Sequence, residues 1–167
     1  MPLTPLHLGP GLFLGMLSRK AFNLFAFLVG SVVMDFEPLI WLMLVPCYTC
    51  PHHGFFHSII GGAVGSAVVA FILWQFREKL RKLSRVLRIE QSFSFAALFF
   101  SSFFAWLIHV FFDSLTHYDV HPFWPWPHNP ILIGRNIVAS EHLIFVGLGI
   151  LGLLLFWQNY FKNSKTN

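Results

Sequence analysis

The sequence predicts an all-α membrane protein: a polytopic bundle of about three full spans, preceded by an N-terminal hairpin of shorter helices. Of the 167 residues, 56% are hydrophobic and only 11% are charged, and the mean hydropathy is +0.65. These values exclude an ordinary soluble domain. Long apolar runs alternate with short polar segments, so we expect a single membrane-embedded domain over residues 1–167.

Two short apolar runs open the chain and predict the hairpin. They cover residues 8–17 and 21–34 and are separated by two basic residues. The second run would be about 21 Å long as a helix, which is less than the roughly 30 Å of a hydrocarbon core. In such a hairpin His7, before the first helix, returns close to Asp35, after the second.

Two carboxylates follow the hairpin, at Asp35 and Glu37, directly before a proline. Because proline disfavours helical geometry in the residue before it, we expect a helix to end here. Residues 39–45 are apolar but too few to span a bilayer. The next segment holds Cys47, Cys50 and two histidines. Its C-x-x-C spacing fits a disulfide, half of a zinc site completed by those histidines, or two free thiols.

Residues 55–76 and 93–116 predict the first two full spans, since each is long enough as a helix to cross the hydrocarbon core. Each carries a stripe of small and polar residues with a spacing of four, which lies on one helix face. Small residues let membrane helices approach closely. We therefore expect the stripes to pack together, with His57, Gly61 and Gly65 in one and Ser101, Ala105, His109 and Asp113 in the other. The alternative is that the small residues serve packing alone and that His57 caps a helix.

A metal-ligand spacing ends the second of these spans. His109 and Asp113 are one helical turn apart, so an imidazole and a carboxylate can converge on one ion. His117 lies one turn further on. A carboxylate inside an apolar membrane helix costs a few kcal/mol, so it indicates a functional site.

Residues 77–91 form a basic segment whose leucines share one face, which is typical of an amphipathic helix lying on a membrane surface. Short loops rich in lysine and arginine are cytoplasmic as a rule, so we expect this segment inside the cell. The formal net charge of +4 comes mostly from it, and no nucleic-acid-binding surface is indicated. The oligomeric state stays open.

The C-terminal third begins with an irregular segment. Residues 118–130 alternate proline with tryptophan, which prevents a regular helix and suits an interfacial loop, either an aromatic anchor or a lip for a substrate. Arg135 follows, a cation able to meet a substrate phosphate. Glu141 and His142 then precede the last predicted span, residues 143–161, and residues 162–167 form a polar tail.

The predicted topology brings the candidate ligands to one side of the membrane. If the basic segment is cytoplasmic, every neighbouring span begins or ends outside with its polar residues. Random placement would seldom give that result. The residues on this non-cytoplasmic face are His7, Asp35, Glu37, His57, His109, Asp113, His117, His121, Glu141 and His142.

Imidazole nitrogens and carboxylate oxygens are ligands for zinc, and manganese or iron also accept them. Two ions can clamp the attacking and leaving oxygens of a phosphoryl transfer, and a bound ion lowers the pKa of its water toward 7. The sequence has no Gly-x-Ser-x-Gly motif, so we favour hydrolysis by water over an acyl enzyme. Asp35, Glu37 and Asp113 are the candidate bases, and the sequence does not select among them.

Three motifs resemble the YdjM-like family of inner-membrane metal-dependent hydrolases, and the resemblance covers most of the chain. Preceded by His7, they are Gly30-Ser-Val-Val-Met-Asp35-Phe-Glu37-Pro, His53-Gly-Phe-Phe-His57-Ser and His109-x-x-x-Asp113. The resemblance implies a helical relative of the zinc-dependent phospholipase C and nuclease superfamily. It implies zinc ligands at Asp35, His57, His109 and Asp113, with His7 beside a neighbouring ion.

The chain departs from the family patterns Pro-Asp-x-Asp and Arg-Gly-x-Thr-His-Ser at Met34, Glu37 and His53. Soluble members of the superfamily complete a second site with His-x-x-x-Glu, whereas Val146 stands four residues after His142. Glu141 or Glu37 would have to take that place. The number of ions, from one to three, therefore stays open.

We therefore predict a membrane-embedded metal-dependent hydrolase that cleaves a phosphoester of a lipid or lipid-linked substrate, which would reach the site by lateral diffusion. A second hypothesis is a transporter of a metal ion or small solute, in which polar residues would recur at several depths. A third is a non-catalytic membrane protein with a structural metal. The gathering of polar residues at one end of the spans favours the hydrolase.

Overall fold

The computed structural model describes residues 5–45, 47 and 51–163. Every regular element within these residues is helical, which confirms the predicted all-α class. Short 3₁₀ helices connect several of the α-helices. The α-helices are α1 (Leu8–Leu17), α2 (Leu24–Gly30), α3 (Phe36–Leu44), α4 (Ile59–Gln75), α5 (Arg77–Val86), α6 (Phe95–Thr116) and α7 (Val138–Lys162).

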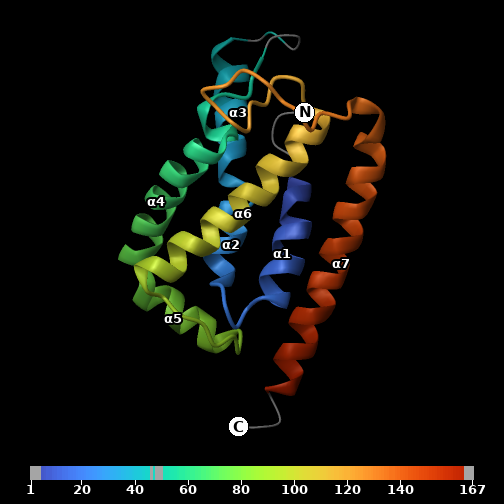
Figure 1. Cartoon of the computed structure of the whole chain (residues 1–167). Helices are drawn as coiled ribbons and strands as arrows, with labels where there is room; N and C mark the ends of the chain where they lie inside the picture. Colours follow the sequence, from blue (N-terminus) through green and yellow to red (C-terminus); the bar gives the residue numbers. More distant parts are fainter. Residues whose placement is uncertain (1–4, 46, 48–50, 164–167) are drawn as a thin grey trace.

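Helix α6 is the centre of the bundle. It crosses the molecule diagonally in Figure 1, and both α2 and α4 pack along it. Helix α1 packs against α2 on one side and against α7 on the other. The loops before α4 and after α6 meet at the same end of the bundle as α3, whereas α5 lies at the opposite end (Figure 1).

Three helical stretches are long and apolar enough to cross a membrane: Leu24–Leu44, Phe95–Thr116 and Arg135–Lys162. Helices α4 and α5 are long and apolar enough only when taken together, and the axis bends by 77° between them. The described chain therefore has three candidate spans, or four if the bent pair counts as one. The predicted count of about three is confirmed, but the predicted span 55–76 is not one of the three, and the stretch Leu24–Leu44 takes its place.

The first span differs from the one expected. The short 3₁₀ helix Val33–Asp35 joins α2 directly to α3, and Pro38 lies within the first turn of α3. Proline is tolerated there because the first amides of a helix have no intrahelical acceptor. The expectation that a helix ends at this proline was therefore wrong. Residues 39–44 belong to a candidate span instead of forming a separate short segment.

Helix α4 is shorter than the sequence indicated. Residues Phe55–His57 form a 3₁₀ turn, and the Ser58 hydroxyl then caps α4 by accepting a hydrogen bond from the Gly61 amide at 3.0 Å. The helix has 17 residues, or about 26 Å. The basic segment forms the separate helix α5 as predicted, but that helix ends at Val86 rather than near residue 91.

Helices α4 and α6 pack closely, as expected from their small residues. A Cβ atom on Gly62 or Gly65 would overlap the indole of Trp106. The Trp106 Nε1–H donates a hydrogen bond to the Phe56 carbonyl at 2.7 Å. Gly61 instead faces the turn before its own helix. This packing holds the turn that carries His57 against the C-terminal half of α6.

Candidate metal centre

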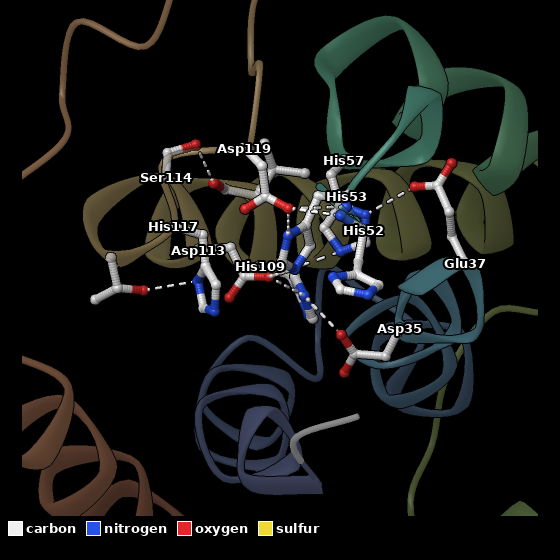
Figure 2. Close-up of polar contacts among 12 residues, drawn as sticks. Asp35, Glu37, His52, His53, His57, His109, Asp113, Ser114, His117 and Asp119 are labelled. Carbon is white, nitrogen blue, oxygen red and sulfur yellow. Dashed lines mark hydrogen bonds and ion pairs between the residues drawn. The ribbon is translucent and has the colours of Figure 1, made fainter. Parts of the chain in front are cut away.

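Asp113, on the last turns of α6, is the centre of a buried group of histidines. Its side chain is 7% exposed, and four imidazole Nε2 atoms face its two carboxylate oxygens. Oδ1 lies 3.2 Å from His7. Oδ2 lies 3.1 Å from His109, 3.7 Å from His57 and 3.9 Å from His53. Figure 2 shows side chains from α6, the turn before α3 and the loop before α4 pointing toward one another.

A second set of groups fixes the orientation of three of these rings. The Nδ1 atom of His109 lies 2.8 Å from the Ser31 carbonyl oxygen. That of His57 lies 2.9 Å from Glu37 Oε2, and that of His53 lies 2.9 Å from Asp119 Oδ2. Carbonyl and ionised carboxylate oxygens only accept hydrogen bonds, so Nδ1 carries the proton in each ring. The Nε2 atoms then face Asp113 and are the ring atoms left to bind an ion, which is how ligand histidines are held around metals.

Glu37 and Asp119 also hold the backbone of the loop before α4. Glu37 accepts hydrogen bonds from the Gly54 amide at 3.1 Å and the Phe56 amide at 3.2 Å. Asp119 accepts from the amides of His52 and His53 at 2.8 and 3.2 Å. Both carboxylates therefore position histidines instead of facing the centre themselves.

Burial favours the neutral imidazole, the form that binds metals, at two positions outside the candidate spans. It lowers the pKa of His57 despite the hydrogen bond to Glu37. It also lowers the pKa of His117 to about 4. Burial alone would raise the pKa of Asp119, but the hydrogen bond and charge of His53 and the two backbone amides outweigh it and hold that pKa well below its usual range.

The ligand atoms fall into two groups that share Asp113. In each group one atom from every residue lies within 4.8 Å of the others: Asp35, His57, His109 and Asp113 in the first, and His53, Asp113 and His117 in the second. Two nitrogens and two carboxylate oxygens in the first group suit zinc, and manganese or iron as well.

Two atoms of the first group are the strongest sign that these residues fit a metal. Asp35 Oδ2 and His57 Nε2 are buried without a hydrogen-bond partner. A buried polar atom in that state is costly unless a ligand satisfies it. The chemistry and the convergence of the donors both match a divalent cation.

His7 is close to the centre but belongs to neither group. Its ring stacks on that of His109 with centroids 3.8 Å apart, and its Nε2 atom approaches Asp113. The Gly9 backbone meets the Phe145 carbonyl on α7 so closely that a Cβ atom would overlap it. Tight packing of α1 on α7 therefore places His7 over the cluster.

Three further predicted ligands lie in neither group: His121, Glu141 and His142. Glu141 is 9% exposed, and its Oε1 atom has no hydrogen-bond partner, like the Nδ1 atom of His121. Arg135 is exposed, and its guanidinium lies 5.6 Å from the centre of the Tyr118 ring. Cys47 is disulfide-bonded, which excludes it as a metal-binding thiolate, and Cys50 is outside the described residues.

Asp119 was not predicted from the sequence, and His53 was considered as a metal ligand only together with the C-x-x-C segment. The spacing His53-x-x-x-His57 is a signal, because one histidine lies just before the turn that precedes α4 and the other ends that turn. The His117-x-Asp119 pair directly after α6 is a weaker signal. The contact between His53 and Asp119 joins two loops, and the two residues are 66 positions apart in the sequence. No local spacing indicates such a contact.

The comparisons with known proteins identify a family but no closer relative. No curated protein and no solved structure matches the chain. The model of the family described as YdjM inner membrane protein matches residues 2–165. That match covers all three motifs and nearly the whole length. The chain therefore belongs to the YdjM inner membrane protein family.

Proposed function

We propose that this protein is a membrane-embedded metal-dependent hydrolase that cleaves a phosphoester of a lipid or lipid-linked substrate. The observation that carries the proposal is the convergence of imidazole Nε2 atoms on Asp113 while the Nδ1 atoms of His53, His57 and His109 are held from behind. A structural metal site usually has a closed set of four ligands. Two donor groups that share one carboxylate instead resemble the centres that act on phosphoesters.

Zinc or a similar cation held by these residues would stabilise charge on the phosphoryl group and lower the pKa of a water molecule. Asp113 can serve both donor groups because its Oδ2 atom faces His57 and His109 of the first group and His53 near the second. His7, above the cluster, can donate a hydrogen bond to a phosphoryl oxygen from its Nε2 atom when that atom is protonated.

Asp35 is the best placed of the three candidate bases. Both oxygens of Glu37 accept hydrogen bonds from the loop before α4, and both oxygens of Asp113 face histidines. Asp35 uses Oδ1 toward His109 at 3.3 Å, whereas its Oδ2 is buried without a partner. In this proposal Oδ1 would bind the ion, and Oδ2 would accept the proton of the attacking water.

The position of the cluster supports a lipid substrate and a non-cytoplasmic site. The C-terminal end of α6 and the loop before α4, which carry the cluster, lie at the end of the bundle opposite the basic helix α5 (Figure 1). Lysine and arginine favour the cytoplasmic side, which supports a cluster on the other side. A phosphoester at that level of a membrane is most often part of a lipid, which would reach the site laterally.

The test combines metal analysis with hydrolysis of phosphomonoester and phosphodiester lipids by the purified protein. We expect metal-dependent turnover that Asp113→Asn and His109→Ala abolish. His128→Ala, which removes an exposed histidine of the loop after α6, serves as the matched control and should behave as wild type. Tightly bound metal without turnover on either class of lipid would contradict the hydrolase and favour a structural metal.

A further inference from the structure

A pocket between α6 and α7 lies beside the candidate metal centre. It is a cavity of about 120 Å³, and most of its lining is apolar, including Phe112, Leu115, Ile144 and Phe145. Glu141 is the one ionisable side chain among the lining residues. A carboxyl group in such surroundings needs a physical explanation, because burial of an unpaired polar group is unfavourable.

Glu141 has no partner for one of its oxygens. The residue is 9% exposed, and its Oε1 atom is buried without a hydrogen bond. Buried polar side-chain atoms are nearly always paired, so an orphaned oxygen in a pocket indicates a ligand group that would meet it. The ligand must be mainly apolar with a polar atom at one end, to match the lining of the pocket.

The pocket and the candidate metal centre share a wall. Phe145 lies one helical turn after Glu141 on the same face of α7. Its ring centroid lies 4.9 Å from those of Phe112 and His7. His7 in turn lies 3.2 Å from Asp113. The Phe145 ring therefore connects the lining of the pocket to the residues around Asp113.

The outer surface next to the pocket is apolar and not covered by protein. Leu143 and Ile144 are 74% and 56% exposed. Of an apolar 18-residue stretch within the last candidate span, only 11% is buried. Lipid chains surround such a surface in a membrane. The occupant consistent with both the lining and the surroundings is the hydrocarbon chain of a membrane lipid.

We propose that this pocket binds the first carbons of a lipid alcohol whose phosphoester lies at the metal centre, and that Glu141 protonates the departing ester oxygen. This inference rests on the hydrolase function proposed above. Water attacks phosphorus, the P–O bond to the lipid alcohol breaks, and the alcohol oxygen takes the proton of Glu141. The proton released by the water passes to Asp35 and then to solvent, from which Glu141 is reprotonated. The products are the free lipid alcohol and a phosphate or phosphate ester.

Binding is tested first, without turnover. Zinc-loaded protein is titrated with dodecylphosphonate and with methylphosphonate, which resist hydrolysis and differ only in chain length. We expect Ile144→Trp, which fills the pocket, to weaken dodecylphosphonate binding at least tenfold and to leave methylphosphonate binding unchanged. Leu143→Trp adds the same side chain outside the pocket and should bind both as wild type. Equal binding by the two variants would overturn the pocket assignment.

The role of Glu141 is tested with two leaving groups. A general acid contributes about 10²- to 10⁴-fold when the leaving group is a poor one such as an alkoxide. We expect Glu141→Gln to slow hydrolysis of dodecyl phosphate at least 100-fold and that of p-nitrophenyl phosphate less than fivefold, with unchanged zinc content. An equal loss on both esters would overturn the acid role while leaving the hydrolase intact. Absence of turnover by wild type on both esters would overturn the hydrolase and this inference together.

Discussion

The Nδ1 atom of His53 lies 2.9 Å from Oδ2 of Asp119, although the two residues belong to different loops. This contact directs the His53 Nε2 atom toward Asp113. Loss of a partner that orients a ligand histidine typically costs 10- to 100-fold in metal affinity. We therefore expect Asp119→Ala to lower the affinity for one of two bound ions by about that factor. Chelator competition measures it, and a uniform loss of both ions would show that Asp119 supports the whole fold instead.

Glu37 is expected to act through His57. Its side chain accepts hydrogen bonds from the His57 ring and from two backbone amides. Glu37→Ala should weaken metal binding about 10- to 100-fold, and Glu37→Gln should recover part of the loss because an amide oxygen still accepts one of these bonds. Metal titration of the two variants is the measurement. If Glu37→Gln kept its metal but lost all turnover, Glu37 would be a base, which was one of the sequence-based expectations.

The contact between α4 and α6 gives a prediction about stability. A Cβ atom on Gly65 would overlap the Trp106 indole, whereas a Cβ atom on Gly147 would meet nothing within 4 Å. Overpacking of this kind costs about 1–3 kcal/mol. Thermal unfolding in detergent should show a lower midpoint for Gly65→Ala and an unchanged or slightly higher one for the control Gly147→Ala. Equal midpoints for the two variants would mean that the helices separate easily here.

The pKa of His117 predicts how stability of the metal-free protein depends on pH. Burial lowers that pKa from 6.5 to about 4, so the unfolded chain binds the proton more tightly than the folded one. The stabilising contribution is fully present above pH 6.5 and is lost as pH falls through 4. Unfolding midpoints measured over this range should decline for wild type. The midpoint of His117→Gln should decline less as the pH is lowered. An equal decline in the two proteins would assign the effect to other groups.

The sequence predicted the parts of the site that depend on local spacing or on topology. The four-residue spacing of His109 and Asp113 fixed their common helix face, and the small residues of α4 explained its close approach to α6. The lengths of the apolar runs placed Asp35 and His57 at the same end of the bundle. Each of these inferences uses helix geometry and the thickness of a bilayer, which the sequence determines directly.

The remaining features depend on contacts that no local pattern determines. Whether a proline ends a helix or lies in its first turn depends on the preceding 3₁₀ turn, so the continuation of the first span through α3 was missed. The loop containing Asp119 has no periodicity, and its carboxylate meets His53 only after both loops have folded. Glu141 and His142 were grouped with the ligands because of their residue types, whereas packing of α7 directs Glu141 into the pocket beside α6.

Metal stoichiometry of the purified protein tests the shared role of Asp113 most directly. After saturation with zinc and removal of excess metal, wild type should retain two ions per chain and His109→Ala should lose one. Asp113→Asn, with unchanged helical content by circular dichroism, should lose both. Retention of the wild-type amount by Asp113→Asn, or absence of bound metal in wild type, would contradict a centre built around this carboxylate.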